Sequence, residues 1–266
     1  MPFRAAEYAD ACKRALGWQP NYQSEGRIYA KYILKNYPNG KIAALWQNDD
    51  AGKDQMKGLR DGLGDKADMI IADKSSEVGD PTVDSQIVAL KDSGADIFVT
   101  WAAPKGAAQA IRKVGELGWK PVYFLGNVST SVATVLRPAG LENAKGIIST
   151  IYLKDPTDLV WKDDPGIKAW LVFSRRRQDQ QQQRLWLCHR ADHVQVLKQC
   201  GDDLTRENVM KQAANLKNFS SEVLLPGIKI NTGPEDLFPI EQMQLMRYDG
   251  ESWRLFGEVI DGEVGH

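Results

Sequence analysis

The stretch KIAALWQNDDAG, residues 41–52, limits the folds open to this chain more than any other part of it. Residues 42–46 form an apolar run too short for a helix, and polar residues flank it, as is typical of a buried parallel strand. Residues 52–63 follow at once with apolar side chains at helical spacing. Residues 48–51 therefore lie in a crevice between a strand end and a helix start, which is where open α/β sheets bind ligands.

The same pattern of a strand followed by a helix repeats through the first half of the chain. Strands are predicted at residues 69–72, 97–101 and 122–125, and helices at residues 26–36, 81–90 and 104–117. Ser24 is the expected N-cap of the first of these helices, and Asp80 with Pro81 is the expected start of the second. Short connections between alternating elements imply right-handed crossovers and a parallel sheet covered on both faces, so we predict an α/β fold.

Three of the predicted strand ends should meet at one edge of this sheet. They are residues 48–50, 100–102 and 126–129. Because parallel strands place their carboxyl ends at the same edge, we expect these residues to form one site.

Charge and hydropathy exclude several classes of function. The chain has 266 residues, of which 34 are basic and 35 acidic, for a net charge of -1. This balance gives no footprint for a polyanion, so we expect no nucleic-acid partner. No apolar run approaches the roughly 18 residues that span a bilayer, and the N-terminus lacks the apolar core of a signal peptide. We expect no membrane insertion, and we expect the chain as written to remain in the cytoplasm.

The sequence offers no cofactor or catalytic motif. Cys12, Cys188 and Cys200 have neither disulfide nor zinc-finger spacing, and the three histidines form no cluster with them. There is no Gly-rich dinucleotide or phosphate loop and no pairing of a nucleophile with a base. We therefore expect no metal, no cofactor and no enzymatic activity.

The chain contains GRIYAKYILKNYPNGKIAALWQNDDAGKDQMKGL, DIFVTWAAPKGAAQAIRKVGELGW and MRYDGESWRLFGEVID. These stretches resemble the branched-chain-amino-acid type of periplasmic solute-binding protein that serves ABC transporters, and the resemblance covers most of residues 18–173 and 194–263. It implies the type I periplasmic-binding-protein fold, in which two α/β lobes joined by three crossovers close on a small ligand. It also implies an ABC transporter permease as partner and, for full-length members, the periplasm.

Carried over position by position, the family's pocket falls on residues from each of the three strand ends. These positions are Asp50, Ala51, Trp101, Ala102, Val128 and Ser129, and the neighbouring Asn48 and Asn127 complete the predicted site. Relatives that bind amino acids usually have an aromatic residue where Ala51 stands and a glutamate, which pairs with the ligand ammonium, where Val128 stands. A buried ammonium without that carboxylate has no partner, so an α-amino acid is not the expected ligand.

A small aromatic or aliphatic carboxylate fits the remaining residues better. Trp101 would supply an aromatic face to a slot otherwise lined by small and apolar side chains. Asn127, Ser129 and the helix start at Gly52 would supply donors to an anion. The NDD sequence also resembles relatives associated with the uptake of aromatic acids.

Each of these residues also has a purely structural interpretation. Asp49 and Asp50 are of the type that caps helices, and Trp101 is of the type that fills cores. Residues 128–131 read equally as a polar loop. For the chain as a whole, the alternative is a small α/β enzyme or a cytoplasmic ligand-sensing domain with the same sheet.

Two stretches depart from the family pattern. Most of the family's first lobe has no counterpart before Trp18, so we expect a truncated chain with half of its cleft missing and weak ligand binding. Residues 174–193 have neither helical nor strand periodicity and include a Gln run. Read one base later, a back-translation of this segment gives family-like sequence, so we hypothesise a reading-frame slip.

The resemblance divides the chain into one complete parallel-sheet lobe and an incomplete second lobe. The parts are an N-terminal remnant and hinge at residues 1–23, the complete lobe at 24–150, the remnant of the first lobe at 151–239 and a hairpin at 240–266 that returns to the complete lobe.

Within the later parts, Thr205 is expected to cap a helix and residues 224–230 to form an extended segment. Residues 242–248 and 253–259 are predicted to form the hairpin. Residues 152–236 lack a sheet to cover, so we expect them to expose apolar surface.

Overall fold

The computed structural model describes residues 19–156, 158–174, 193–234, 236 and 238–264. Two compact units divide the chain, and each is described by itself. Unit 1 takes in Tyr22–Ile151 and Met243–Val264, and unit 2 takes in Tyr152–Gln242. The segment singled out at residues 174–193 lies outside the described residues except at its two ends, as does most of the N-terminal remnant.

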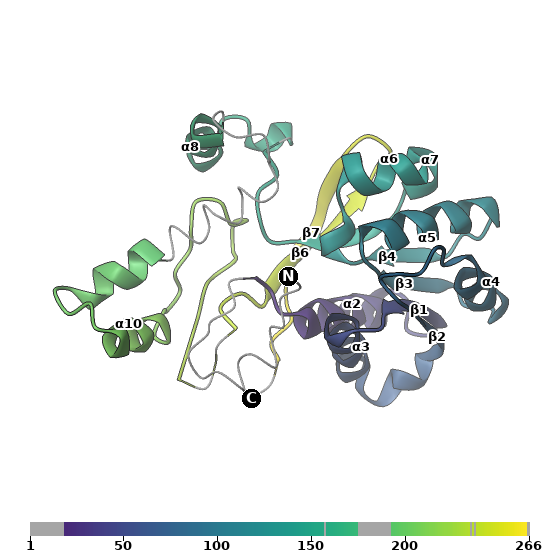
Figure 1. Cartoon of the computed structure of the whole chain (residues 1–266), viewed down its shortest axis with the longest axis horizontal. Helices are drawn as coiled ribbons and strands as arrows, with labels where there is room; N and C mark the ends of the chain where they lie inside the picture. The colour runs from purple at the N-terminus through teal and green to yellow at the C-terminus, as the bar shows by residue number, and fades with distance from the viewer. Residues whose placement is uncertain (1–18, 157, 175–192, 235, 237, 265–266) are drawn as a thin grey trace. The chain divides into compact units, whose positions relative to one another are not determined.

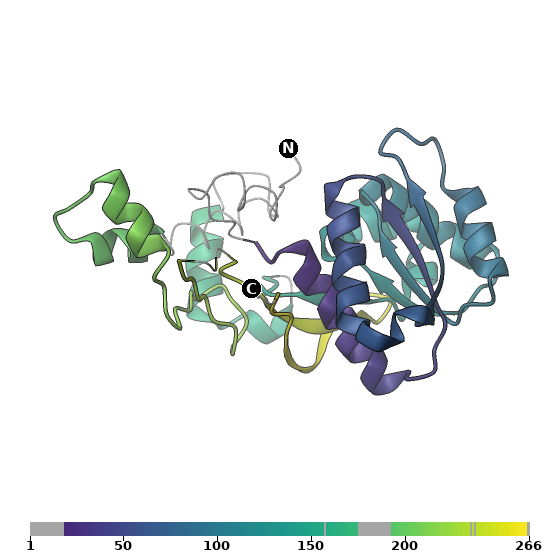
Figure 2. The same cartoon turned by 90° about the horizontal axis from the view of Figure 1, so that it is seen from below.

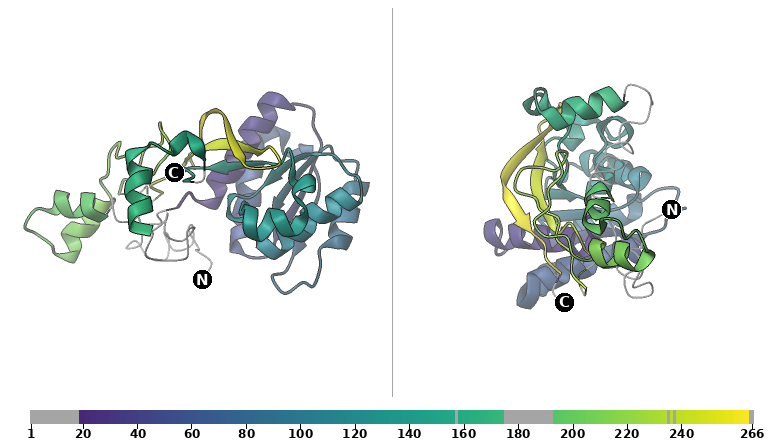
Figure 3. Two further views of the ribbon diagram at one scale, coloured as in Figure 1. Left: turned by 90° about the horizontal axis from the view of Figure 1, so that it is seen from above. Right: turned by 90° about the vertical axis from the view of Figure 1, so that its left-hand side faces the viewer.

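One seven-stranded sheet, in the order β2-β1-β3-β4-β5-β6-β7, forms the framework of unit 1. The first five strands in this order are parallel, and β6 joins β5 in the antiparallel direction. The hairpin of β6 and β7, yellow in Figure 3, extends the sheet as predicted. The strands are β1 (Ile42–Gln47), β2 (Ile70–Ser76), β3 (Ile97–Trp101), β4 (Val122–Leu125), β5 (Ile148–Ile151), β6 (Gln242–Tyr248) and β7 (Trp253–Asp261).

Helices cover both faces of this sheet (Figures 1 and 2). On one face lie α2 (Tyr22–Asn36) and α3 (Asp50–Leu63), and on the other lie α4 (Asp84–Asp92) and α5 (Pro104–Glu116). Shorter helical turns fill the connections: η1 (Gly64–Met69), η2 (Asn127–Ser129), η3 (Val132–Leu136), α6 (Arg137–Ala139) and α7 (Leu141–Ala144). The predicted α/β fold is therefore confirmed.

The alternation of side chains along the strands builds a separate core on each face. Ala43, Leu45 and Phe98 point toward α4 and α5, where they join one apolar cluster. On the opposite face the ring of Tyr29 packs on Trp101 and Phe124, at centroid distances of 5.9 and 5.2 Å. Because both faces of the sheet are buried, β1 and β3 carry nearly continuous apolar runs and do not alternate between apolar and polar residues.

Two of the predicted helix starts are wrong. Helix α2 begins at Tyr22, so Ser24 is a buried residue inside its first turn and not its N-cap. Helix α4 begins at Asp84, and Asp80 instead accepts a hydrogen bond from the Glu77 amide at 2.8 Å. The Asp80 amide donates to the Glu77 carbonyl at 3.1 Å, so Asp80 closes a tight turn, a position that aspartate favours.

Unit 2 has little regular structure among its described residues. It contains η4 (Leu159–Trp161), α8 (Pro165–Ser174), a helical run at 193–200 and α10 (Arg206–Ala213). Thr205 caps α10 as predicted, since its side chain accepts from the Asn208 amide. The expected extended segment at 224–230 takes part only in isolated bridges, at Leu224 and Ile230.

Several large apolar side chains of unit 2 are exposed, among them Val160 at 72%, Val172 at 71% and Leu204 at 62%.

Across the described parts of the chain, the helices are all too short or too polar to cross a membrane.

Helices α2 and α3 approach so closely that glycine is required between them. A β-carbon on Gly58 would lie 2.1 Å from the Gln23 carbonyl oxygen, and one on Gly26 would lie 2.4 Å from that of Gln55. Both distances are far below van der Waals contact with backbone atoms that cannot move aside.

We predict that Gly58→Ala lowers the free energy of unfolding by about 1–3 kcal/mol, although alanine is the better helix former, because the two helices must separate. Urea unfolding of unit 1 followed by circular dichroism measures the change. Gly79→Ala is the control, since a β-carbon there meets no atom within 4 Å. Equal stability of the Gly58→Ala variant and the unmodified protein would contradict this packing.

Candidate functional site

The carboxyl ends of β1, β3 and β4 lie together at one edge of the sheet, as the sequence predicts. Trp46 pairs with Trp101, and Thr100 pairs with Leu125, so the three strands end at nearly the same level. Two hydrogen bonds join the segments that follow. The Ala103 amide donates to Gln47 Oε1 at 3.2 Å, and the Ser129 hydroxyl donates to the Ala102 carbonyl at 2.8 Å.

The first segment is organised by Asp49, which is the N-cap of α3. Its Oδ1 accepts from the Gly52 amide at 2.9 Å, and its Oδ2 accepts from the side chain of Gln47. Asp50 and Ala51 are half-buried residues in the first turn of α3. We expected the Gly52 amide to donate to a ligand anion. In this conformation that expectation is wrong, because the Gly52 amide already donates to the carboxylate of Asp49.

Asn48 lies on the outer side of this segment. It is exposed, and its Nδ2 donates to Glu77 Oε1 at 2.7 Å while its amide donates to the Ser76 carbonyl at 2.8 Å. These bonds tie the end of β1 to β2.

The second segment is dominated by Trp101, which is 2% exposed. Its ring is stacked on Tyr29 with an angle of 14° between the ring planes, so one aromatic face is covered by the core. Its indole Nε1 is buried and has no hydrogen-bond partner among the described residues. A buried donor left unpaired costs about 1–3 kcal/mol, which makes this atom a candidate contact for a ligand acceptor. Ala102, also buried at 4%, follows it.

The third segment is the turn η2, which begins directly after Gly126. A β-carbon on Gly126 would lie 2.7 Å from Trp101 Cδ1, so glycine allows the indole ring to lie against the backbone there. Within the turn, Val128 is 44% exposed and Ser129 is 1% exposed. Asn127 is half-buried, and its Nδ2 makes only a weak contact, 3.8 Å to the sulfur of Met243.

Glu25 is a further residue of this region that sequence reasoning missed. It is 1% exposed, and its Oε1 accepts from the Asn127 amide at 2.7 Å and from the Thr150 hydroxyl at 3.0 Å. Its Oε2 accepts from Gln55 Nε2 at 3.2 Å. Burial raises the pKa of this carboxyl group, and the hydrogen bonds oppose the shift without cancelling it. The available signal was its position one helical turn before Tyr29, on the apolar face of α2.

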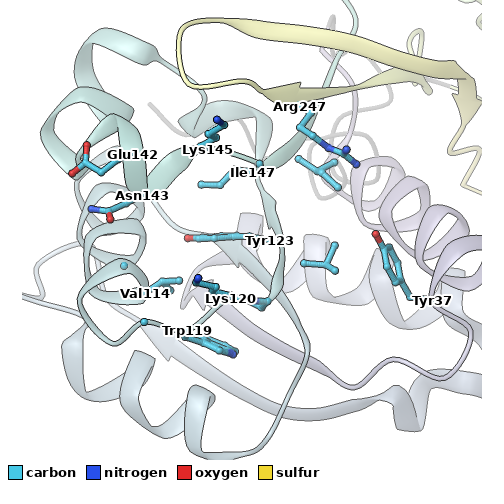
Figure 4. Close-up of a pocket in the computed structure, with 16 residues that line it drawn as sticks. Tyr37, Val114, Trp119, Lys120, Tyr123, Glu142, Asn143, Lys145, Ile147 and Arg247 are labelled. Atoms are coloured by element: carbon cyan, nitrogen blue, oxygen red, sulfur yellow. The ribbon is translucent and has the colours of Figure 1, made fainter.

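A cavity of about 570 Å³ lies at the opposite edge, beside the amino ends of β4 and β5 (Figure 4). It opens where these strands separate, since they pair only at Phe124 and Ile148. The Trp119 indole at its wall donates to the Ala95 carbonyl at 3.2 Å, so this donor is already engaged. None of the predicted site residues lines this cavity.

Within the described ranges, no group of three or more potential metal-binding side chains is found. The buried Ser129 hydroxyl has given its proton to a carbonyl and has no base beside it in the hydrogen bonds described above.

A sequence profile of the periplasmic binding protein family matches residues 8–252. This chain belongs to the periplasmic binding protein family. A search of curated protein sequences found no match. The sheet and its covering helices are those of the type I periplasmic-binding-protein fold predicted from the sequence.

Solved structures with the same fold include other periplasmic binding proteins. A branched-chain amino acid ABC transporter protein from Thermus thermophilus with bound valine is 14% identical, with a TM-score of 0.74 over 90% of this chain and 65% of that one. A possible leucine/isoleucine/valine-binding protein from Rhodopirellula baltica is 14% identical, with a TM-score of 0.75 over 95% and 69%. A fatty acid ABC transporter substrate-binding protein from Thermomonospora curvata is 16% identical, with a TM-score of 0.72 over 90% and 63%.

The chain thus spans about 65% of the length of the Thermus thermophilus protein. At these identities the likeness establishes the fold, and the ligand has to be argued from the site itself.

The side chain of Asp49 caps α3, so changing it should alter the stability of unit 1. Asp49→Ala should lower the free energy of unfolding by about 1 kcal/mol, because the Gly52 amide loses its acceptor. Asp49→Asn keeps one side-chain oxygen for the Gly52 amide but places its amide nitrogen against the donor of Gln47, so it should lose less stability than Asp49→Ala. Thermal unfolding of the three proteins measures this, and an equal loss in both variants would show that the side-chain oxygen does not cap α3.

Proposed function

We propose that this chain is the solute-binding component of an ABC import system and that its ligand is a small aromatic or aliphatic carboxylate. Membership of the periplasmic binding protein family supports solute binding as the class of function. The ligand would lie at the carboxyl edge of the unit 1 sheet, against Asp50, Ala51, Trp101, Ala102 and the turn Asn127–Ser129, and would be delivered to the permease of the transporter.

The observation that carries the ligand class is the unpaired indole Nε1 of Trp101. It is a buried donor at the edge where the three strands end, and a ligand carboxylate supplies the acceptor it lacks. Asn127 adds an amide whose Nδ2 is bonded only weakly to sulfur. Both groups are donors, so together they favour an anion.

The glutamate that amino-acid-binding relatives usually provide for the ligand ammonium is missing at this edge. Val128 occupies the position at which amino-acid-binding relatives usually carry a glutamate. Glu25, which contacts the backbone of Asn127, is fully buried and already bonded through both oxygens. Asp49 uses both oxygens to cap α3 and to hold Gln47. An ammonium group buried against Val128 would lack that partner, at a cost of several kcal/mol.

We predict that 4-hydroxybenzoate binds the chain with a dissociation constant at least about tenfold lower than that of leucine, a difference of about 1.4 kcal/mol or more. Calorimetric titration at millimolar ligand measures both. Cyclohexane carboxylate and benzyl alcohol separate the contribution of the carboxylate from that of the ring. Tighter binding of leucine than of 4-hydroxybenzoate would overturn the proposed ligand class.

Val128→Glu should weaken 4-hydroxybenzoate by about three- to tenfold, since two like charges about 4 Å apart in water repel by about 1 kcal/mol. Val128→Gln is the matched control, because it has the same length without the charge and should bind the acid as the unmodified protein does. The difference between the two variants should shrink as salt is added. An equal effect of both substitutions would indicate that size and not charge matters at this position.

A further inference from the structure

The contacts of Glu25 raise a question about its proton. The hydroxyl of Tyr29 lies 2.6 Å from the Leu125 carbonyl oxygen and 3.0 Å from Glu25 Oε1. A phenol has one proton to donate, and a carbonyl oxygen can only accept. The shorter contact therefore takes the Tyr29 proton, and the 3.0 Å contact between Tyr29 and Glu25 needs a proton from elsewhere.

An ionised Glu25 leaves this contact without a proton. Two oxygen atoms would then face each other with lone pairs only, next to a negative charge that is removed from water. Among the described residues no lysine or arginine forms an ion pair with Glu25. A buried carboxylate without a cation normally takes up a proton instead.

We propose that Glu25 is a neutral carboxylic acid in the folded protein, donates its proton to Tyr29, and is a positioning residue for the turn Asn127–Ser129. The resulting series of hydrogen bonds runs from Glu25 to Tyr29 and from Tyr29 to the carbonyl of Leu125, which is the last residue of β4. At the same time Oε1 still accepts from the amide of Asn127, two residues beyond Leu125. The acid thus holds both sides of Gly126, against which Trp101 packs.

Within the described ranges, the groups that contact Glu25 or lie beside it are uncharged. Helix α2 contributes Tyr22 and Tyr29, α3 contributes Gln55, and β5 contributes Thr150. Burial raises the pKa of both tyrosines, so they stay neutral as well. Nothing among these partners stabilises a carboxylate by charge.

Glu25 also lies next to the points at which the chain leaves unit 1. It follows the first residue of the unit, Tyr22, by less than one helical turn, and its partner Thr150 precedes the last residue before the second connection, Ile151. Its other partner, Asn127, contacts Met243, the first residue after the third connection. Glu25 is therefore bonded beside one of these ends, at Thr150, and it also bonds Asn127, the residue that contacts Met243 at another.

The stability of the protein should depend on pH through this group. Because burial raises the pKa of Glu25 above its ordinary value, the folded protein holds a proton that the unfolded chain has released. Stability is then greatest below the ordinary glutamate pKa and falls as the pH rises toward the folded pKa of Glu25. Glu25→Gln removes this dependence while keeping the size and neutrality of the protonated acid.

The test compares the unmodified protein with Glu25→Gln and Glu25→Ala by urea unfolding between pH 5 and pH 9, without ligand. The unfolding constant of the unmodified protein should increase relative to that of Glu25→Gln by up to about tenfold per pH unit until Glu25 ionises in the folded state. Glu25→Ala should be less stable than Glu25→Gln at every pH. A ratio that does not change with pH would overturn the neutral acid.

A second measurement needs no variant and covers the case in which Glu25→Gln does not fold. The carboxyl carbon of Glu25 in the unmodified protein should titrate above the ordinary range of glutamate by nuclear magnetic resonance, and the Asn127 amide should shift with the same midpoint. A Glu25 signal that titrates in the ordinary range would contradict the protonation. An Asn127 amide that ignores the titration would contradict the positioning role. The protonation of Glu25 does not depend on a ligand. Only the role of the turn Asn127–Ser129 in binding rests on the proposed function, so either claim can fail while the other holds.

Discussion

The parallel pairing of β1, β3 and β4 is the constraint on which the rest of unit 1 depends. It brings three sequence-distant segments to one edge, because parallel strands all end on the same side of a sheet. It also requires helices on both faces, and α2 and α3 meet this requirement at a distance that only glycine permits. The packing of Trp101 on Tyr29 follows from the same arrangement.

At the site, two buried polar groups have opposite requirements. Glu25 has hydrogen-bond partners for both oxygens but no cation among the residues that the structure describes, and the proposed proton neutralises it. The indole Nε1 of Trp101 is a donor with no acceptor among the described residues, and in the proposed function a ligand oxygen provides one. A binding edge with a spare donor and a neutral acid favours carboxylates over ammonium groups. This is the physical basis of our proposal that the ligand of this chain is a carboxylate without an ammonium group.

The elements of unit 1 were predictable because short apolar runs and helical spacing depend on nearby residues alone. The predicted helix start at Asp80 was wrong because aspartate is common both at helix starts and in tight turns. Here Asp80 closes a turn, and α4 begins at Asp84. Glu25 could not be recognised from its neighbours, because Asn127 and Thr150 lie 102 and 125 residues further along the chain. The same applies to Trp101, whose ring is covered by a tyrosine from a different helix. The alternation of strands and helices predicted the edge, and the resemblance named pocket positions at it. Only the packed structure showed which donors there are already engaged.

The position of the ligand is tested most directly by the indole resonances of two tryptophans in a proton–nitrogen spectrum. Trp101 lies at the carboxyl edge with an unpaired Nε1, whereas Trp119 lines the cavity at the opposite edge with its Nε1 bonded to Ala95. On addition of 4-hydroxybenzoate, the Nε1–H signal of Trp101 should move downfield as it gains an acceptor, and that of Trp119 should stay in place. A saturable shift at Trp119 with none at Trp101 would place the ligand in the cavity and contradict this account.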